Sequence, residues 1–153
     1  HLIGNMWFLW IYGDNVEDIL GHGKYLLFYL LCGIAAALVH AVLNTYSRVP
    51  TLGASGAIAG VMGAYMVKFP HSRIITLVPI VIFLTTIEIP AFLILLYWFA
   101  LQIFSGVGSI GYSNVSRGGV AWFAHVGGFV AGMLLILVMR SRERFRNRRD
   151  LSW

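Results

Sequence analysis

The sequence predicts an all-α protein, a polytopic transmembrane helix bundle with about five spans. Of the 153 residues, 59% are hydrophobic and only 11% are charged, whereas a soluble domain usually carries about a quarter charged residues. The apolar residues fall in blocks long enough to cross a bilayer, and the polar faces that a soluble helical core needs are missing. The bilayer is therefore the expected solvent for the domain at residues 1–139.

The first part of the chain contains two apolar blocks and the loops around them. The chain starts inside an apolar segment without an initiating Met, so we expect it to be truncated at the N-terminus. The expected elements are a first span at 1–14, a polar stretch at 14–18, a turn at 21–24, a second span at 25–43 and an outer loop at 44–53.

The rest of the chain contains three more apolar spans and one exceptional segment. The stretch from Ile74 to Ser105 is too long for one span and is interrupted by Pro79, Glu88 and Pro90. If its first part also crossed the bilayer, the arginine-rich end of the chain would lie outside. The expected elements are a short third span at 54–67, an interfacial or re-entrant segment at 74–86, a fourth span at 89–106, a Gly- and Ser-rich loop at 108–118 and a last span at 119–139.

The basic residues support this topology. Nine of the 11 Lys and Arg residues fall on one side and only Arg48 and Arg117 on the other, as the positive-inside rule requires. The net charge of +5 comes largely from the end of the chain, so we predict a basic cytoplasmic tail at 140–153 and no binding of nucleic acid. The six arginines of this tail are Arg140, Arg142, Arg144, Arg146, Arg148 and Arg149.

Three polar residues inside spans fall at one depth. His1 lies 13 positions before Asp14, Ser55 lies 13 before Lys68, and His125 lies 15 before Arg140. At the helical rise per residue, all three lie roughly 20–22 Å above the cytoplasmic edge of a core about 30 Å thick. Polar groups inside a bilayer are costly, so this common layer is a candidate functional site.

The chemistry of nucleophilic catalysis needs this set of groups. A serine hydroxyl is a weak nucleophile unless a base such as neutral imidazole accepts its proton, and the developing oxyanion needs hydrogen-bond donors. Ser55 stands at a helix start, where backbone N–H groups are unsatisfied. Asn5 is one turn from His1 on the same face, so it is a further candidate donor.

Structural interpretations of the same residues stay open at this point. Glycines and serines permit close packing of membrane helices, and Gly53, Gly56, Gly128 and Gly132 fit that role. Ser55 on its own fits it too. His40, with Asn44 four residues later, falls at a similar depth to His125, so spacing alone leaves two candidate bases. Cys32 is the only cysteine, which excludes an internal disulfide.

Three motifs in order resemble those of the rhomboid intramembrane serine proteases. His1-Leu2-Ile3-Gly4-Asn5 with its downstream run resembles the family's second transmembrane helix, and Gly53-Ala54-Ser55-Gly56 resembles its G-x-S-G nucleophile motif. Ala124-His125-Val126-Gly127-Gly128, continuing to Gly132, is similar to the A-H-x-x-G-x-x-x-G of its last core helix. The chain departs from the family in lacking the first core helix and its loop before His1, and in having Ala59 where some relatives place an aromatic that stacks on the histidine.

The resemblance implies roles for these residues. Ser55 is expected to be the nucleophile and His125 the base of a serine endopeptidase dyad, with His1, Asn5 and the Ser55 backbone N–H as the oxyanion site. It also selects His1 over His40 for that site. The implied partners are the lipid bilayer and transmembrane protein substrates, with no metal or cofactor, in a bacterial inner membrane.

Two alternatives belong to other classes of protein. A rhomboid-like protein without proteolytic activity would bind transmembrane clients and leave them uncut. A small transporter would use the buried histidines for protons, but such proteins often carry inverted repeats and midplane carboxylates, and the sequence shows no repeat.

Overall fold

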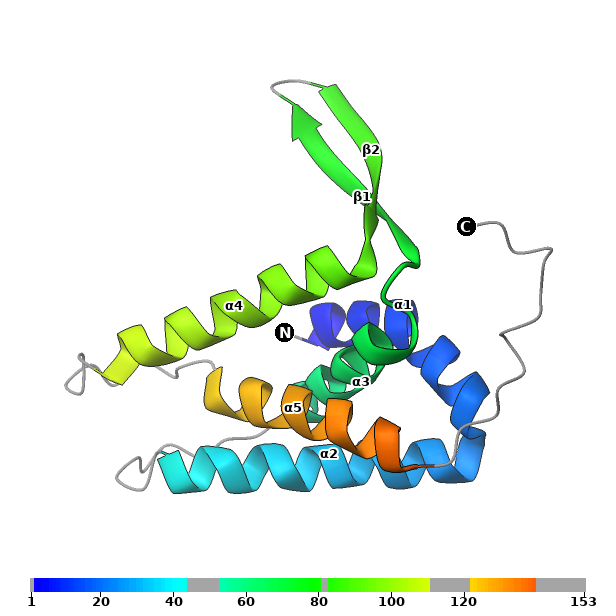
Figure 1. Ribbon diagram of the computed structural model, residues 1–153. Helices are drawn as coiled ribbons and strands as arrows, with labels where there is room; N and C mark the ends of the chain where they lie inside the picture. Colours follow the sequence, from blue (N-terminus) through cyan, green and yellow to red (C-terminus); the bar gives the residue numbers. More distant parts are fainter. Residues whose placement is uncertain (1, 44–52, 81–82, 111–121, 140–153) are drawn as a thin grey trace.

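The computed structural model describes residues 2–43, 53–80, 83–110 and 122–139 (Figure 1). Within these ranges the chain forms five helices and one β-hairpin, so the predicted helical bundle is confirmed with one departure. The elements are α1 (Leu2–Leu20), α2 (His22–Leu43), α3 (Ser55–Lys68), β1 (Arg73–Ile80), β2 (Phe83–Pro90), α4 (Ala91–Ile110) and α5 (Trp122–Val138).

The number of spans stays a prediction. In the described ranges, α2 and the Ala91–Gly108 part of α4 are each long and apolar enough to cross a membrane. α5 is apolar but has 17 residues, and α3 has only 14. The boundaries of α2, α3, α4 and α5 lie within a few residues of the predicted ones.

α1 continues through the polar stretch that was expected to end the first span. Asp14 and Asp18 are exposed, while Val16 and Ile19 between and after them are buried, so one side of the helix still packs on the bundle. The helix ends at Gly21, whose φ of 79° is a left-handed conformation that favours glycine. α2 therefore starts after a single turn residue.

α3 is the central helix. It contacts α1, α2, α4 and α5 (Figure 1), and every residue from Gly56 to Tyr65 is buried. The core around it contains Tyr12 of α1, Phe28 of α2 and Phe129 of α5. A short helix made mostly of small residues can be surrounded in this way because its neighbours approach its backbone closely.

The contact between α3 and α5 is a glycine seam, made by Gly56, Gly60, Gly63, Gly128 and Gly132. A methyl group added at Gly128 or Gly132 would overlap the carbonyl oxygen of Gly56 or Gly60, and one added at Gly63 would overlap the carbonyl oxygen of Phe129. The two backbones are therefore in direct contact. Gly53 lies outside the seam and is exposed.

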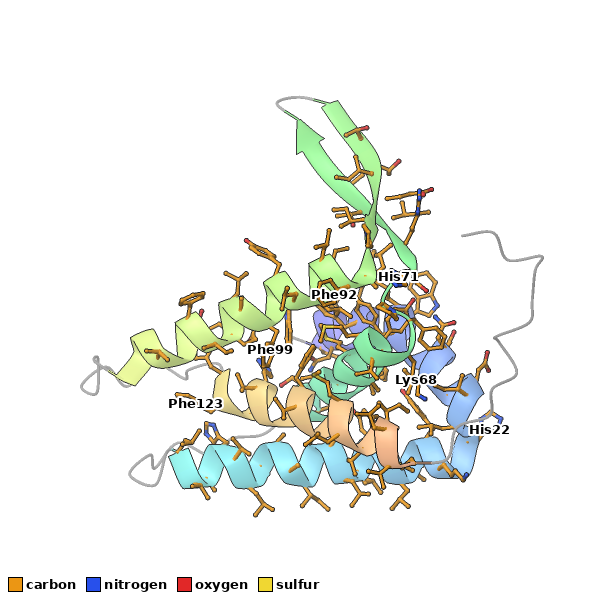
Figure 2. The ribbon with its side chains drawn as sticks, viewed as in Figure 1. His22, Lys68, His71, Phe92, Phe99 and Phe123 are labelled. Atoms are coloured by element: carbon orange, nitrogen blue, oxygen red, sulfur yellow. The ribbon has the colours of Figure 1, made fainter. Side chains whose placement is uncertain are left out.

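Aromatic side chains fill the space between α4 and α5 (Figure 2). Phe99 of α4 stacks on Phe129 of α5 with a centroid separation of 4.6 Å. Near the other end of this contact, a Cβ added to Gly106 would lie 3.2 Å from the Phe123 ring. α4 is thus held by large rings, whereas α3 meets α5 through its backbone.

The departure from an all-helical chain is the β1–β2 hairpin, which occupies the predicted interfacial or re-entrant segment. The antiparallel register runs from Arg73 opposite Pro90 to Ile80 opposite Phe83. Runs of Ile, Thr and Val favour extended structure over a helix, which explains the difference. The hairpin projects away from the helices, at the end of the bundle where α3 finishes and α4 begins (Figure 1).

Candidate active site

Ser55 is the first residue of α3, at the end of the bundle opposite the hairpin. It is half-buried, while Gly53 and Ala54 before it are exposed. Ala54 provides no side-chain cap, so the N–H groups of the first helical turn have no side-chain acceptor from that residue. Ser55 therefore lies at a helix N-terminus, where the first backbone N–H groups lack intrahelical acceptors. Its side chain is partly accessible there.

His125 lies one turn into α5 and is buried, with 9% of its surface exposed. Its Nδ1 lies 2.8 Å from Oε1 of Gln102, a buried α4 residue that the sequence analysis did not single out. Two indole rings flank the imidazole, Trp98 with a centroid separation of 5.8 Å and Trp122 with one of 6.4 Å. The aromatic rings beside this imidazole thus come from α4 and α5.

The glycine seam brings the segments of Ser55 and His125 to one level. A Cβ added at Gly56 would lie 3.5 Å from the Ala124 carbonyl oxygen. Ser55 directly precedes Gly56 and His125 directly follows Ala124. Among the hydrogen bonds of the described residues, His125 is paired with Gln102, and none joins it to the Ser55 hydroxyl.

His40 lies at the same end of the bundle. Ala36, one turn before it on α2, packs against Gly56, and a Cβ added at Gly127 would lie 2.6 Å from the Cβ of Val39. The fold therefore packs the helices of both candidate bases against each other and against the start of α3. His1 and Asn44 fall outside the described residues, so the predicted oxyanion role of His1 remains a prediction. Asn5 is half-buried on α1.

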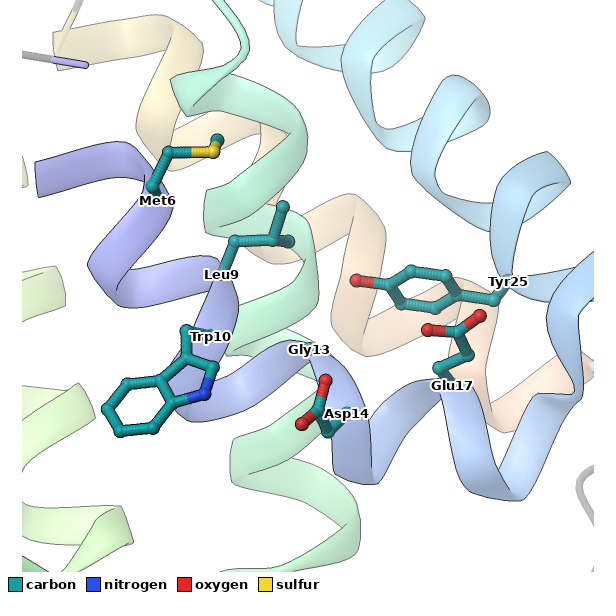
Figure 3. A pocket seen from close by; sticks show the side chains of 7 residues that line it. All are labelled: Met6, Leu9, Trp10, Gly13, Asp14, Glu17 and Tyr25. Carbon is teal, nitrogen blue, oxygen red and sulfur yellow. The ribbon is translucent and has the colours of Figure 1, made fainter. Parts of the chain in front are cut away.

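No cluster of three or more His, Cys, Asp or Glu side chains suited to a metal ion occurs in the part of the chain that the structure describes. Cys32 is a free, buried thiol against Gly60. A shallow hollow is present along α1 and is closed on one side by Tyr25 of α2 (Figure 3). Its lining does not include Ser55 or His125, and consists of Met6, Leu9, Trp10, Gly13, Asp14, Glu17 and Tyr25.

Gln102 was missed for a physical reason. It is a single amide in the middle of an apolar and aromatic helix, and its partner His125 is 23 residues away in the sequence. A signal was nevertheless present, because polar side chains inside an apolar span usually face a partner. His1, Ser55 and His125 are candidates on that ground, and Gln102 belongs with them.

Comparison with known proteins identifies several relatives. Rhomboid protein 1, mitochondrial, of Saccharomyces cerevisiae is 31% identical over 159 residues, which covers 97% of this chain and 41% of that protein. Rhomboid protease GluP of Bacillus subtilis is 33% identical, over 86% of this chain and 22% of that protein. Presenilin-associated rhomboid-like protein A, mitochondrial, of Danio rerio is 35% identical, over 54% of this chain and 22% of that protein.

The chain thus spans less than half the length of these relatives. No solved structure matched it. The relatives include mitochondrial proteins and a bacterial one, so they do not support the bacterial inner membrane in particular. The model of the Rhomboid domain matches residues 1–142. The chain therefore belongs to the rhomboid family of membrane-integral proteins.

Proposed function

We propose that this chain is part of an intramembrane serine endopeptidase that cuts transmembrane segments of membrane proteins through a Ser55–His125 dyad. The observation that carries the proposal is the glycine seam, where Gly56 lies against Ala124. Because backbone meets backbone there, the helices that bear the two reacting groups have little freedom to slide. A relative covering 86% of this chain is named a protease, which supports the same conclusion.

In the proposed acylation step, His125 accepts the Ser55 hydroxyl proton at Nε2 as Oγ attacks the scissile carbonyl carbon. The carbonyl oxygen becomes an oxyanion, stabilised by the backbone N–H of Ser55 with Asn5 and His1 as further donors. His125 then gives its proton to the leaving amine nitrogen, the C–N bond breaks, and an ester on Ser55 remains.

Hydrolysis of that ester uses the same groups in reverse. Water attacks the ester carbonyl while His125 accepts the water proton, and the proton returns to Oγ as the C–Oγ bond breaks. The exposed Gly53 and Ala54 leave the N-terminal end of α3 open on one side, which is where water is expected to enter. No metal or cofactor takes part in either step.

The proposed substrates are transmembrane segments with small or helix-breaking residues near the cut. A peptide carbonyl in a regular helix is engaged in an intrahelical hydrogen bond and shielded by side chains, so the segment must unwind before Ser55 can reach it. Gly and Pro lower that barrier, since they disfavour helix by about 1 and 3 kcal/mol per residue. We also propose that residues 140–153, which lie outside the described residues, form a cytoplasmic tail.

The alternative is a rhomboid-like protein that binds transmembrane clients without cutting them. The hydrogen bonds of His125 bear on this alternative, because among the described residues its imidazole is bonded to Gln102 and not to Ser55. Hydrogen bonds of catalytic groups are often formed only in the substrate complex, so this observation is compatible with both candidates.

The two candidates differ in their reaction with a serine probe. We expect the full-length protein in proteoliposomes to be labelled by a fluorophosphonate and to cleave a transmembrane substrate carrying a Gly-rich segment. Ser55→Ala should abolish labelling, and His125→Ala should slow it by at least about 10²-fold, the typical contribution of a general base. Labelling that persists in Ser55→Ala ends the catalytic assignment.

His40→Ala is the matched control for the base. It removes the imidazole of the other candidate base and should leave labelling within about threefold. If His40→Ala loses labelling and His125→Ala keeps it, the base is on α2. A folded wild-type protein that is neither labelled nor active on any destabilised substrate favours the client-binding alternative.

A further inference from the structure

We infer that Gln102 is a positioning residue that holds His125 in the tautomer and orientation needed to accept the proton of Ser55. The inference rests on the proposed function, because it assigns the residue that prepares the base. It concerns a side chain on α4, a helix that carries neither of the two reacting groups. The argument starts from the contact between Gln102 and the imidazole.

The contact is a buried polar pair. Gln102 is 6% exposed and His125 is 9% exposed, and Oε1 lies 2.8 Å from Nδ1. A buried donor or acceptor without a partner is costly, by about 1–3 kcal/mol, so each side chain restrains the other. The bond joins α4 to α5 at the level where α5 meets the start of α3.

The orientation of the Gln102 amide follows from its second contact. The Gln102 Nε2 group lies 3.4 Å from the backbone oxygen of Trp98, one turn earlier on α4. A carbonyl oxygen can only accept, so the NH₂ side of the amide belongs there and Oε1 is left facing His125.

This orientation decides the tautomer of the imidazole. Oε1 can only accept, so the Nδ1 atom of His125 must carry the hydrogen and donate it to Gln102. In a neutral imidazole only one nitrogen carries hydrogen, so Nε2 keeps its lone pair. That is the form that can act as a base, and the other tautomer could not accept a proton at Nε2.

Two rings restrict rotation of the imidazole. Trp98 lies on one side with an interplanar angle of 40°, and Trp122 meets it edge-on at 87°. Trp98 therefore acts twice: its carbonyl orients the Gln102 amide and its ring packs on His125. One turn of α4 supplies both restraints.

The bond should also strengthen during the reaction. When His125 takes the proton it becomes a cation, and a hydrogen bond from a charged donor is roughly twice as strong as a neutral one. Interactions that are stronger in the transition state than in the ground state raise kcat. Removal of Gln102 should therefore lower kcat and leave KM nearly unchanged.

The test uses the full-length protein in proteoliposomes, with kcat and KM for a Gly-rich transmembrane substrate and the rate of Ser55 labelling. Gln102→Met keeps a similar volume without an acceptor oxygen and should lower kcat by about 10²-fold with KM within twofold, in the range of general-base effects. Gln102→Glu keeps an acceptor oxygen and should stay within about tenfold of wild type. Ser105→Ala, on the same helix, is the control and should leave kcat within twofold.

Three outcomes would overturn the inference. The first is a folded Gln102→Met variant with the kcat of wild type. The second is an equal loss in Gln102→Met and Gln102→Glu, which would mean that only the native side chain packs there. The third comes from ¹⁵N NMR of the histidine-labelled wild-type protein, with His125 assigned through His125→Gln. We expect hydrogen on Nδ1, and hydrogen on Nε2 would refute the proposal even if neither Gln102 variant folds.

Failure of the proposed function looks different. In that case wild type itself neither cleaves nor labels, while the NMR signal still shows hydrogen on Nδ1. Gln102 would then orient a histidine that is not a base, and the positioning role in catalysis would fall together with the dyad.

Discussion

The glycine seam between α3 and α5 and the β1–β2 hairpin hold together by opposite means. In the seam, backbone meets backbone and a single methyl group at Gly128 has no space. In the hairpin, the strands are joined by their own ladder, and apolar side chains such as Ile75 and Leu77 remain 72% and 60% exposed. The seam brings together the helices of the candidate active site, while the hairpin projects from the opposite end of the bundle (Figure 1).

The difference indicates which parts of this fold tolerate amino-acid substitutions. Lipid is as apolar as leucine, so helices in a bilayer are held by close packing more than by burial of apolar surface. A stretch of small residues is therefore more sensitive to substitution than a stretch of large exposed ones. The predictions below compare the two regions on that basis.

Gly128→Ala should have the largest effect. The added methyl group meets the Gly56 carbonyl oxygen, and because this partner is backbone, the helices must separate. We expect a loss of about 3 kcal/mol in the free energy of unfolding, at the upper end for overpacked sites, and loss of serine-probe labelling. Gly108→Ala, where no atom lies within 4 Å, should be neutral or slightly stabilising. Equal melting temperatures for the two variants would contradict the close backbone contact between Gly128 and Gly56.

Gly56→Ala should have an intermediate effect on stability, which a second substitution should relieve in part. Its methyl group meets the Ala36 side chain at 2.5 Å, and a side chain can be shortened. We expect a loss of about 1–2 kcal/mol, relieved in part by adding Ala36→Gly. A double-mutant cycle measured by thermal unfolding should give a coupling of about 1 kcal/mol, and strict additivity would show that the two residues do not touch.

Arg73→Gln should have a small effect. The Arg73 guanidinium lies 3.2 Å from the Glu88 carboxylate at the base of the hairpin, but both side chains are more than half exposed. Exposed ion pairs contribute about 0–1 kcal/mol, so we expect a change within that range that shrinks at high salt. A loss as large as that of Gly128→Ala would mean that the hairpin, too, supports the bundle.

Leu77→Ser should have the smallest effect on stability, within about 0.5 kcal/mol, because the side chain makes few contacts that unfolding would break.

No charged residue occurs between Arg73 and Glu88, so we expect the hairpin to lie at the membrane surface. Leu77→Trp in proteoliposomes tests this by fluorescence quenching with brominated lipids, against wild type as background. Absence of added quenching would place the hairpin in water.

Much of the helical framework was predictable from the sequence, because each long apolar block indicates a helix. The helix of the expected third span, at 54–67, is observed at Ser55–Lys68. The hairpin was not predictable in the same way, since a short apolar run interrupted by Pro79 fits a strand or a membrane segment equally well. The continuation of α1 to Leu20 depends on a buried side that only the neighbouring helices reveal.

The candidate site was predictable in part. Ser55 and His125 stood out through their depth and motifs, and the fold brings their helices into contact through Gly56 and Ala124. Gln102 and the two indole rings around the imidazole belong to elements whose arrangement no local pattern encodes.

The shortness of α3 has one more consequence. Its 14 residues rise only about 21 Å, against a hydrocarbon core of about 30 Å. α3 is therefore about 9 Å shorter than a core of that thickness, so we expect Ser55 to lie below the outer membrane surface. A thinner bilayer would bring the serine closer to that surface and a thicker one would place it deeper, so we expect bilayer thickness to affect how readily water reaches Ser55.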